Sequence, residues 1–212
     1  MTAFPFDTNP NEPIKLGLIV LSSDETIEDE FRAMLPKSCS LFQTRIHSAP
    51  EVTPDTLMEM KAGLAASAAM IPPSFNVDVI GYACTSGAKM IGPSNVVTEV
   101  QKVHPNSQVC TPITAVMRAL NTLGARKIGM VTPYILDVSQ EIRNLLIENR
   151  FDISALVSFE VSTEAIVASI TADAIKRAVR AAAVDGVDAV FISCTNLRTV
   201  DVIGDLEDEL GI

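Results

Sequence analysis

The feature that most constrains this chain is a repeated pattern, an apolar strand that ends at a Cys-Thr pair. The first copy is "VDVIGYACTSG" (77–87) and the second is "VDAVFISCTNL" (187–197). A single free cysteine would indicate only packing, because cysteine is among the most frequently buried residues. Two cysteines that follow matching strands need a common explanation. We therefore interpret Cys84 and Cys194 as one functional pair.

Apolar runs that are typical of buried strands alternate with helical periodicity along the whole chain. Strands are predicted over 14–21, 40–48, 77–83, a short stretch ending near Cys110, 127–133, 153–161 and 188–193. Helices are predicted over 25–35, 53–71, 93–103, 112–124, 136–149, 172–184 and 199–209. This alternation predicts an α/β fold with parallel sheets. The pattern restarts near residue 111, which predicts a loose arm (1–13) and two pseudo-symmetric α/β halves (14–111 and 112–212).

Composition and charge exclude several classes of protein. The formal net charge of −10 argues against nucleic acid, because a phosphate-binding surface needs clustered Lys and Arg. No apolar run approaches the roughly 20 residues that span a bilayer, so we expect no membrane partner. The start of the chain lacks a secretory signal pattern, which predicts a cytoplasmic protein. Four widely spaced cysteines and two separate histidines give no metal-binding pattern, so no metal is predicted.

The positions of the two cysteines suggest a chemistry. In open α/β sheets ligands bind at the carboxyl ends of strands, so two facing halves would bring Cys84 and Cys194 to opposite walls of one cleft. One thiolate could remove a proton or add to a double bond while the other thiol donates a proton. The polar residues that follow could donate hydrogen bonds to a carboxylate, namely Thr85, Ser86, Thr195 and Asn196. Such a site needs no cofactor and could racemise, isomerise or decarboxylate small carboxylic acids.

The loops "ACTSG" and "SCTNLRT", with "TPITAVMRALNTLGARKIGMVTPY" between them, resemble the aspartate/glutamate racemase superfamily. Within it, the chain is most similar to the branch of maleate cis–trans isomerases and arylmalonate decarboxylases, over nearly its whole length from about Ile14. The resemblance implies a racemase-like fold, Cys84 as nucleophile, Cys194 as acid/base and Tyr134 as a substrate contact. It also implies a homodimer or higher homo-oligomer. Without it, Tyr134 would be an ordinary loop residue.

Two residues depart from the pattern of the similar isomerases. Those proteins carry a Pro-Ser-Ser-Asn loop that holds a substrate carboxylate, whereas "LSSDET" keeps Ser22 and Ser23 as donors but has Asp24. Glu164 stands near the place of a second asparagine. If both acids face the cleft, they would repel a dicarboxylate and suit an ammonium or amide group. Alternatively, Asp24 caps the helix over 25–35 and Glu164 is a first-turn helix acid.

Two other expectations rest on the same resemblance. Similar proteins continue beyond "LEDELGI" with a strand and a helix that return to the first half, so this sequence is expected to lack that unit. "DETIEDEF" resembles a subgroup linked to ectoine utilisation.

Three functions remain open. Similar decarboxylases keep only the second cysteine, so the intact pair favours a cofactor-independent isomerase or racemase of a small carboxylic acid. The first alternative is an arylmalonate-type decarboxylase that uses Cys194 alone. The second is a small-molecule-binding protein that has no catalytic activity.

Overall fold

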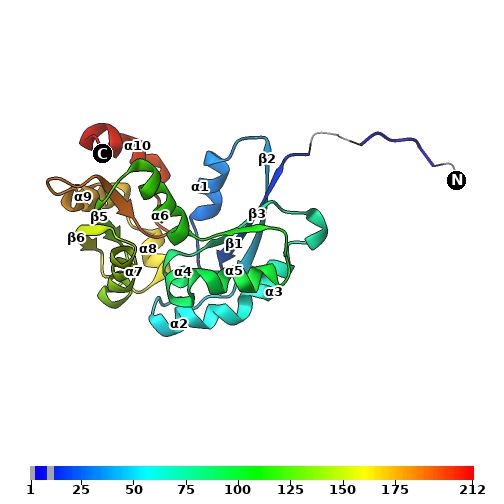
Figure 1. The fold of residues 1–212 in the computed structure, drawn as a ribbon, viewed down its shortest axis with the longest axis horizontal. Coiled ribbons are helices and arrows are strands. Elements are labelled where there is room, and N and C mark those ends of the chain that lie inside the picture. The colour runs from blue at the N-terminus through cyan, green and yellow to red at the C-terminus, as the bar shows by residue number, and fades with distance from the viewer. Residues whose placement is uncertain (1–2, 9–11) are drawn as a thin grey trace.

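The first half of the chain forms a parallel sheet of four strands (Figure 1). The computed structural model describes residues 3–8 and 12–212. The strands are β1 (Ile14–Leu21), β2 (Cys39–Ile46), β3 (Val79–Ala83) and β4 (Gln108–Cys110), in the spatial order β2-β1-β3-β4. Residues 17–21 of β1 are buried, because strands flank both edges of β1 and its alternate side chains pack into hydrophobic clusters on the two faces of the sheet, as the continuous hydrophobic pattern predicts.

The second half forms a parallel sheet of three strands in the order β6-β5-β7. These are β5 (Lys127–Thr132), β6 (Asp152–Ser158) and β7 (Ala189–Ile192). β3 and β7 hold comparable places beside their central strands, but only β3 has a further strand outside it among the described residues. The predicted α/β architecture of two parallel-sheet halves is confirmed, and the division at residue 111 stays a prediction.

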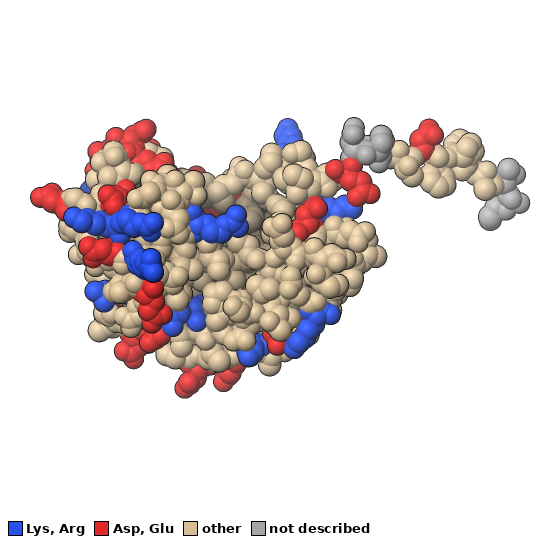
Figure 2. All heavy atoms as spheres, in the orientation of Figure 1, with Lys and Arg blue, Asp and Glu red and all other residues tan. Residues whose placement is uncertain are grey.

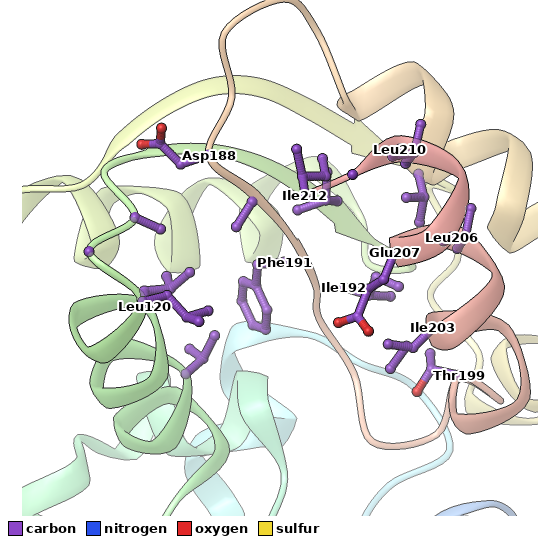
Figure 3. Close-up of a pocket in the computed structure, with 18 residues that line it drawn as sticks. Leu120, Asp188, Phe191, Ile192, Thr199, Ile203, Leu206, Glu207, Leu210 and Ile212 are labelled. Atoms are coloured by element: carbon purple, nitrogen blue, oxygen red, sulfur yellow. The ribbon is translucent and has the colours of Figure 1, made fainter.

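In the second sheet a groove runs along β7, at the place that corresponds to β4 in the first sheet. Its volume is about 750 Å³. Figure 3 shows that α6 (Pro112–Leu123) and α10 (Val200–Leu210) form its walls and that Phe191 and Ile192 lie between them. This hollow is lined mainly by apolar side chains and lies beside the outer edge of β7.

The other helices cover the two sheets. They are α1 (Ile27–Met34), α2 (Pro54–Glu59), α3 (Leu64–Ala69), α4 (Thr85–Ile91), α5 (Pro93–Gln101), α7 (Leu136–Glu148), α8 (Glu164–Ala168) and α9 (Ala172–Ala182). Thr53 caps α2 with its side chain and Pro54 opens it, as the sequence indicates. The long helix predicted over 53–71 is wrong, however, because a 3-10 segment (Met60–Gly63) separates α2 from α3.

The structure differs most clearly from the sequence-based expectation in the segment that follows Cys84. We predict a polar loop after Cys84, but Thr85–Ile91 form helix α4. The sequence of this segment gives only a weak helical signal, because the segment is short and contains Gly87, and a glycine costs about 1 kcal/mol in a helix. The helix forms because Thr85 to Ala88 are buried and Cys84 caps its first turn.

The face in Figure 2 shows acidic and basic side chains side by side at the end formed by α9 and α10. Lys176 pairs with Asp205 at 2.5 Å and Arg180 pairs with Glu209 at 2.7 Å, so the small basic cluster of α9 lies against acids of α10. Among the described residues, no helix is both long enough and apolar enough to cross a membrane.

Candidate active site

The carboxyl ends of β3 and β7 meet where the two halves of the molecule join. Cys84 follows β3 directly, and Cys194 follows β7 after Ser193. The hydroxyl of Thr195 lies 3.2 Å from the Ala83 carbonyl oxygen and 3.2 Å from Oδ2 of Asp24. The loop after β7 is thus bound to the ends of β3 and β1, and the two cysteine segments lie against each other.

Cys84 is buried and caps α4. Its backbone is extended, with φ at −152°. The Gly87 N–H donates to Sγ at 3.2 Å, and the Ser86 hydroxyl lies 3.6 Å from Sγ. Burial raises the pKa of Cys84 to about 12, an effect that the contacts of Ser86 and Gly87 reduce and the charge of Glu164 increases. The resting thiol is therefore protonated at neutral pH.

Cys194 is held in a different backbone conformation. Its φ is 125°, a region that residues with a side chain rarely adopt. The Asn196 N–H lies 3.4 Å from Sγ. Burial of the thiol raises the pKa of Cys194 well above its usual value, and the charge of Glu164 adds to this, while the Tyr134 hydroxyl lowers it. Cys194 is thus also a protonated thiol at rest.

Tyr134 and Tyr82 enclose the two thiols. Tyr134 is fully buried and follows the turn after β5, and the charges of Cys194 and Cys84 both raise its pKa in addition to burial. A Cβ at Gly87 would lie 2.7 Å from the Tyr82 hydroxyl and 2.9 Å from Sγ of Cys84. Position 87 therefore has room only for glycine, which the sequence pattern did not reveal.

Asp24 is buried and uses both of its carboxylate oxygens within the protein. Oδ1 accepts hydrogen bonds from the N–H groups of Thr26 at 2.8 Å and Ile27 at 2.9 Å. Oδ2 faces the Thr195 hydroxyl. Burial raises the pKa of Asp24, and these bonds lower it in part. Of the two predicted roles, the geometry supports the one at the start of α1, where Asp24 holds the N–H groups of the N-cap residue Thr26 and of Ile27, and it adds a contact to the second cysteine segment.

Glu164 is the first residue of α8, and its carboxylate turns to Asn196. The side-chain amide of Asn196 donates to Oε2 of Glu164 at 2.8 Å and to the backbone carbonyl oxygen of Glu164 at 3.2 Å. Oδ1 of Asn196 accepts the Glu25 N–H at 2.9 Å. Both amide hydrogens of Asn196 are therefore used, so this side chain supports Glu164. Burial raises the pKa of Glu164, and the Asn196 bond lowers it.

The remaining predicted donors divide into two groups. Ser22 and Ser23 gather around Ser48 at the end of β2, with hydroxyl distances of 3.1 and 2.9 Å. Ser48 was not identified from the sequence as a site residue. The one signal for it in the sequence is its position just after an apolar strand. Ser48 lines a small cavity together with Glu164 and Met60. Thr85 is buried, and its hydroxyl makes no hydrogen bond to another described residue.

The groove along β7 is separate from this site, since its lining contains neither cysteine. Within residues 3–8 and 12–212, no three His, Cys, Asp or Glu side chains gather in a way that could hold a metal ion.

Comparison with known proteins places this arrangement in a family. Residues 77–212, which include both cysteines, match the family model described as arylmalonate decarboxylase. The chain belongs to this family. It is 27% identical to maleate isomerase of Nocardia farcinica over 210 residues, covering 93% of this chain and 83% of that protein. The predicted superfamily branch is thereby confirmed.

Solved structures of the same branch share the fold. The chain superposes with a TM-score of 0.86 on a Cys-to-Ala mutant of the maleate isomerase Iso from Pseudomonas putida S16 with maleate, at 21% identity, covering 93% of this chain and 84% of that one. It superposes with a TM-score of 0.84, at 25% identity, on a Cys-to-Ser mutant of the Nocardia farcinica maleate cis–trans isomerase. That match covers 93% of this chain and 85% of the other. The Nocardia mutant contains a covalently bound succinylcysteine intermediate.

Proposed function

We propose that this protein is a cofactor-independent isomerase of the maleate isomerase type, acting on a small carboxylic acid through Cys84 and Cys194. The observation that carries the proposal is the pairing of a buried thiol, Cys84, with a half-buried one, Cys194, at the ends of β3 and β7, where Thr195 contacts Ala83. Similarity to maleate isomerases over 93% of the chain supports it. The succinylcysteine intermediate of the Nocardia relative supports a covalent route.

The first chemical step is addition of a thiolate to the substrate double bond. Cys84 loses its proton to solvent before the reaction. Its sulfur forms a bond to one alkene carbon, and the π electrons move to the neighbouring carbon, which takes a proton from the Cys194 thiol. The former double bond is then a single bond and rotates. Cys194, now a thiolate, removes the proton again, the C–S bond breaks, and the trans acid leaves with Cys84 restored as thiolate.

The environments of the two thiols suit these roles. Gly87 N–H and the Ser86 hydroxyl can stabilise a thiolate at Cys84. Cys194 stays protonated because burial and the Glu164 charge raise its pKa, so it is ready to donate. We assign the unpaired hydroxyl of Thr85 and the Ser22–Ser23 group to substrate binding, and Tyr134 to contact with both substrate and Cys194.

A decarboxylase is the second candidate, favoured by the description of the matching family model. Carbon dioxide would leave a substituted malonate, and Cys194 alone would protonate the resulting carbanion. A protein that only binds a small acid is the third. A homo-oligomer in the cytoplasm remains our prediction for the enzyme.

The two cysteines can be tested separately. Isomerisation of four-carbon cis-alkenoic acids and decarboxylation of arylmalonates should be measured for the wild type, Cys84→Ser and Cys194→Ser. We expect each variant to lose isomerisation by at least about 10³-fold, because each removes a reacting group. Decarboxylation that survives Cys84→Ser would support the second candidate instead. Acid binding without turnover of any substrate would support the third.

A further inference from the structure

Glu164 is fixed at the joint between the two halves. The segment before it pairs with residues 50–52 of the first half, since the Val52 N–H donates to Ser162 at 2.8 Å and the Glu164 N–H donates to Pro50 at 3.1 Å. The residue is 6% exposed. Its carboxylate is therefore held in place by both halves and can rearrange little.

The two oxygens of this carboxylate have different surroundings. Oε2 accepts the Asn196 amide at 2.8 Å, whereas Oε1 accepts no hydrogen bond from any described residue. Glu164 also lines the small cavity that Ser48 and Met60 border. Met60 accepts the Tyr82 hydroxyl at 3.6 Å and would touch a Cβ at Gly87, so this cavity lies beside the Cys84 segment.

Glu164 is electrostatically coupled to the reacting groups. Its charge raises the pKa of Cys84, Cys194 and Tyr134. Asn196 joins Cys194 to it by donating hydrogen bonds to Sγ of Cys194 at 3.4 Å and to Oε2 of Glu164 at 2.8 Å. Asp24 raises its pKa further, while no Lys or Arg of the described residues pairs with it. Arg45, the cation that acts on Asp24, forms its ion pair with Glu28.

Asp24 is also a buried acid of the site, but it has no carboxylate oxygen without a hydrogen bond. Both of its oxygens already accept hydrogen bonds from the protein. Oε1 of Glu164 is different: it accepts no hydrogen bond within the described residues, yet the fully buried side-chain atoms that lack a partner there are Gln43 Nε2 and Ser193 Oγ, so Oε1 keeps contact with solvent that a substrate N–H group can replace. A second substrate carboxylate cannot do so, because ionised carboxylates only accept hydrogen bonds and repel each other.

We propose that Glu164 is a specificity-determining residue, whose unpaired Oε1 accepts a hydrogen bond from an N–H group of the substrate. The substrate is then a small acid with one carboxylate and one amide or ammonium group, in place of a dicarboxylate. Asn196 acts as a positioning residue, because its amide fixes the carboxylate of Glu164. This inference rests on the proposed function, since it assigns the substrate class of the same site.

Three probes of one carbon skeleton test the proposal. Maleate, maleamate and cis-4-aminocrotonate present a carboxylate, an amide and an ammonium group at the same end. Their dissociation constants should be measured by calorimetry in a Cys84→Ser background, where no covalent addition occurs. We expect maleate to bind at least about tenfold more weakly than the better of the other two, because it alone brings a second negative charge.

Glu164→Gln should reduce the ratio between the dissociation constant of maleate and that of the better probe by about tenfold or more. The contact with Asn196 should persist, since the glutamine oxygen still accepts a hydrogen bond from the Asn196 amide. Glu164→Asp keeps the charge and should keep the order of affinities. Glu148→Gln, an exposed position on α7 with the same change in charge, is the matched control and should leave the order unchanged.

The outcomes separate the inference from the proposed function. The inference would be overturned if the Cys84→Ser protein bound maleate most tightly of the three probes. It would also be overturned if Glu164→Gln left the ratio of these dissociation constants unchanged. Turnover that depends on both cysteines would then still support the enzyme. Binding of none of the three probes would overturn the inference together with the small-acid function. Preference for maleamate over the ammonium probe, or the reverse, supports the inference and names the donor.

Discussion

The two cysteine segments have nearly the same sequence but different local structures. Cys84 has an extended backbone and caps a helix, so its thiol receives an N–H group from the first turn of α4. Cys194 has a positive φ and lies in a turn, where its thiol receives the Asn196 N–H. A regular element positions the first thiol, and a strained backbone that side-chain contacts hold in place positions the second.

This difference agrees with the different chemical roles that we propose for the two thiols. Although burial keeps Cys84 protonated at rest, its backbone and hydroxyl donors lower its pKa in part and can stabilise the thiolate that a nucleophile needs. Glu164 raises the pKa of both thiols, but at Cys84 the Ser86 contact outweighs it. At Cys194, Glu164 outweighs each of the contacts of Tyr134 and Asn196, which favours the protonated form that an acid needs. Similar residues at equivalent strand ends thus have different neighbours, which is the basis for the unequal tasks that we propose.

The largest predicted effect concerns the packing around Cys84. Gly87→Ala should destabilise the fold by about 3 kcal/mol, because its Cβ would lie under 3.0 Å from Tyr82, Cys84 and Met60. Urea denaturation measures the change. Gly204→Ala in α10 is the control, since nothing lies within 4 Å of its Cβ, and it should stabilise by about 1 kcal/mol. Equal effects at both positions would contradict the crowded first site.

The second prediction removes the side chain that organises the Cys194 segment. Asn196→Ala leaves Glu164 and the Glu25 N–H without their partner and should cost about 2 kcal/mol of unfolding free energy. Ser86→Ala, the corresponding change near Cys84, removes one weak contact to sulfur and should cost less than about 1 kcal/mol. Thermal and chemical unfolding of both variants check this order, which a larger loss for Ser86→Ala would reverse.

A third, smaller effect separates the two backbones. At position 194 glycine should be about 1 kcal/mol more stable than alanine, because only glycine adopts the positive φ without strain. At position 84 alanine should be the more stable, since the backbone there is extended. Denaturation of the four variants compares the positions directly. Alanine being preferred at both would show that the backbone at 194 is unstrained.

The smallest predicted effect is a shift in pH dependence. Raised pKa values mean that Cys84 and Cys194 become thiolates, and so react with iodoacetamide, only at more alkaline pH than the unperturbed value of about 8.5. Because the Tyr134 hydroxyl lowers the pKa of Cys194, Tyr134→Phe should move the Cys194 midpoint further upward. The Cys84 midpoint should not move. Peptide mass spectrometry at several pH values reads both sites, and a downward shift at Cys194 would contradict the contact.

The sequence predicts the fold well where local signals agree with packing. β1 ends where the apolar run ends, and α6 ends at its C-cap residue Gly124, the last residue of its predicted range, which has a left-handed conformation. The helix after Cys84 could not be predicted, because its stability comes from burial of a short segment that contains a glycine and ends at another. The pairing of Asn196 with Glu164 and the role of Ser48 were also hidden. They depend on contacts between residues far apart in the chain, which strand and helix patterns do not encode.

The most direct test of the central claim, that the two thiols have unequal roles, is the site of covalent addition. Cys194→Ser and Cys84→Ser should each be incubated with maleate, maleamate and cis-4-aminocrotonate and then analysed by peptide mass spectrometry. We predict that an adduct with the mass of an added acid accumulates on Cys84 in Cys194→Ser, because solvent protonates the carbanion and no Cys194 thiolate then removes that proton to release the acid. Cys84→Ser should give no adduct on Cys194. An adduct on Cys194, or none in either variant with any of the three acids, would contradict the account.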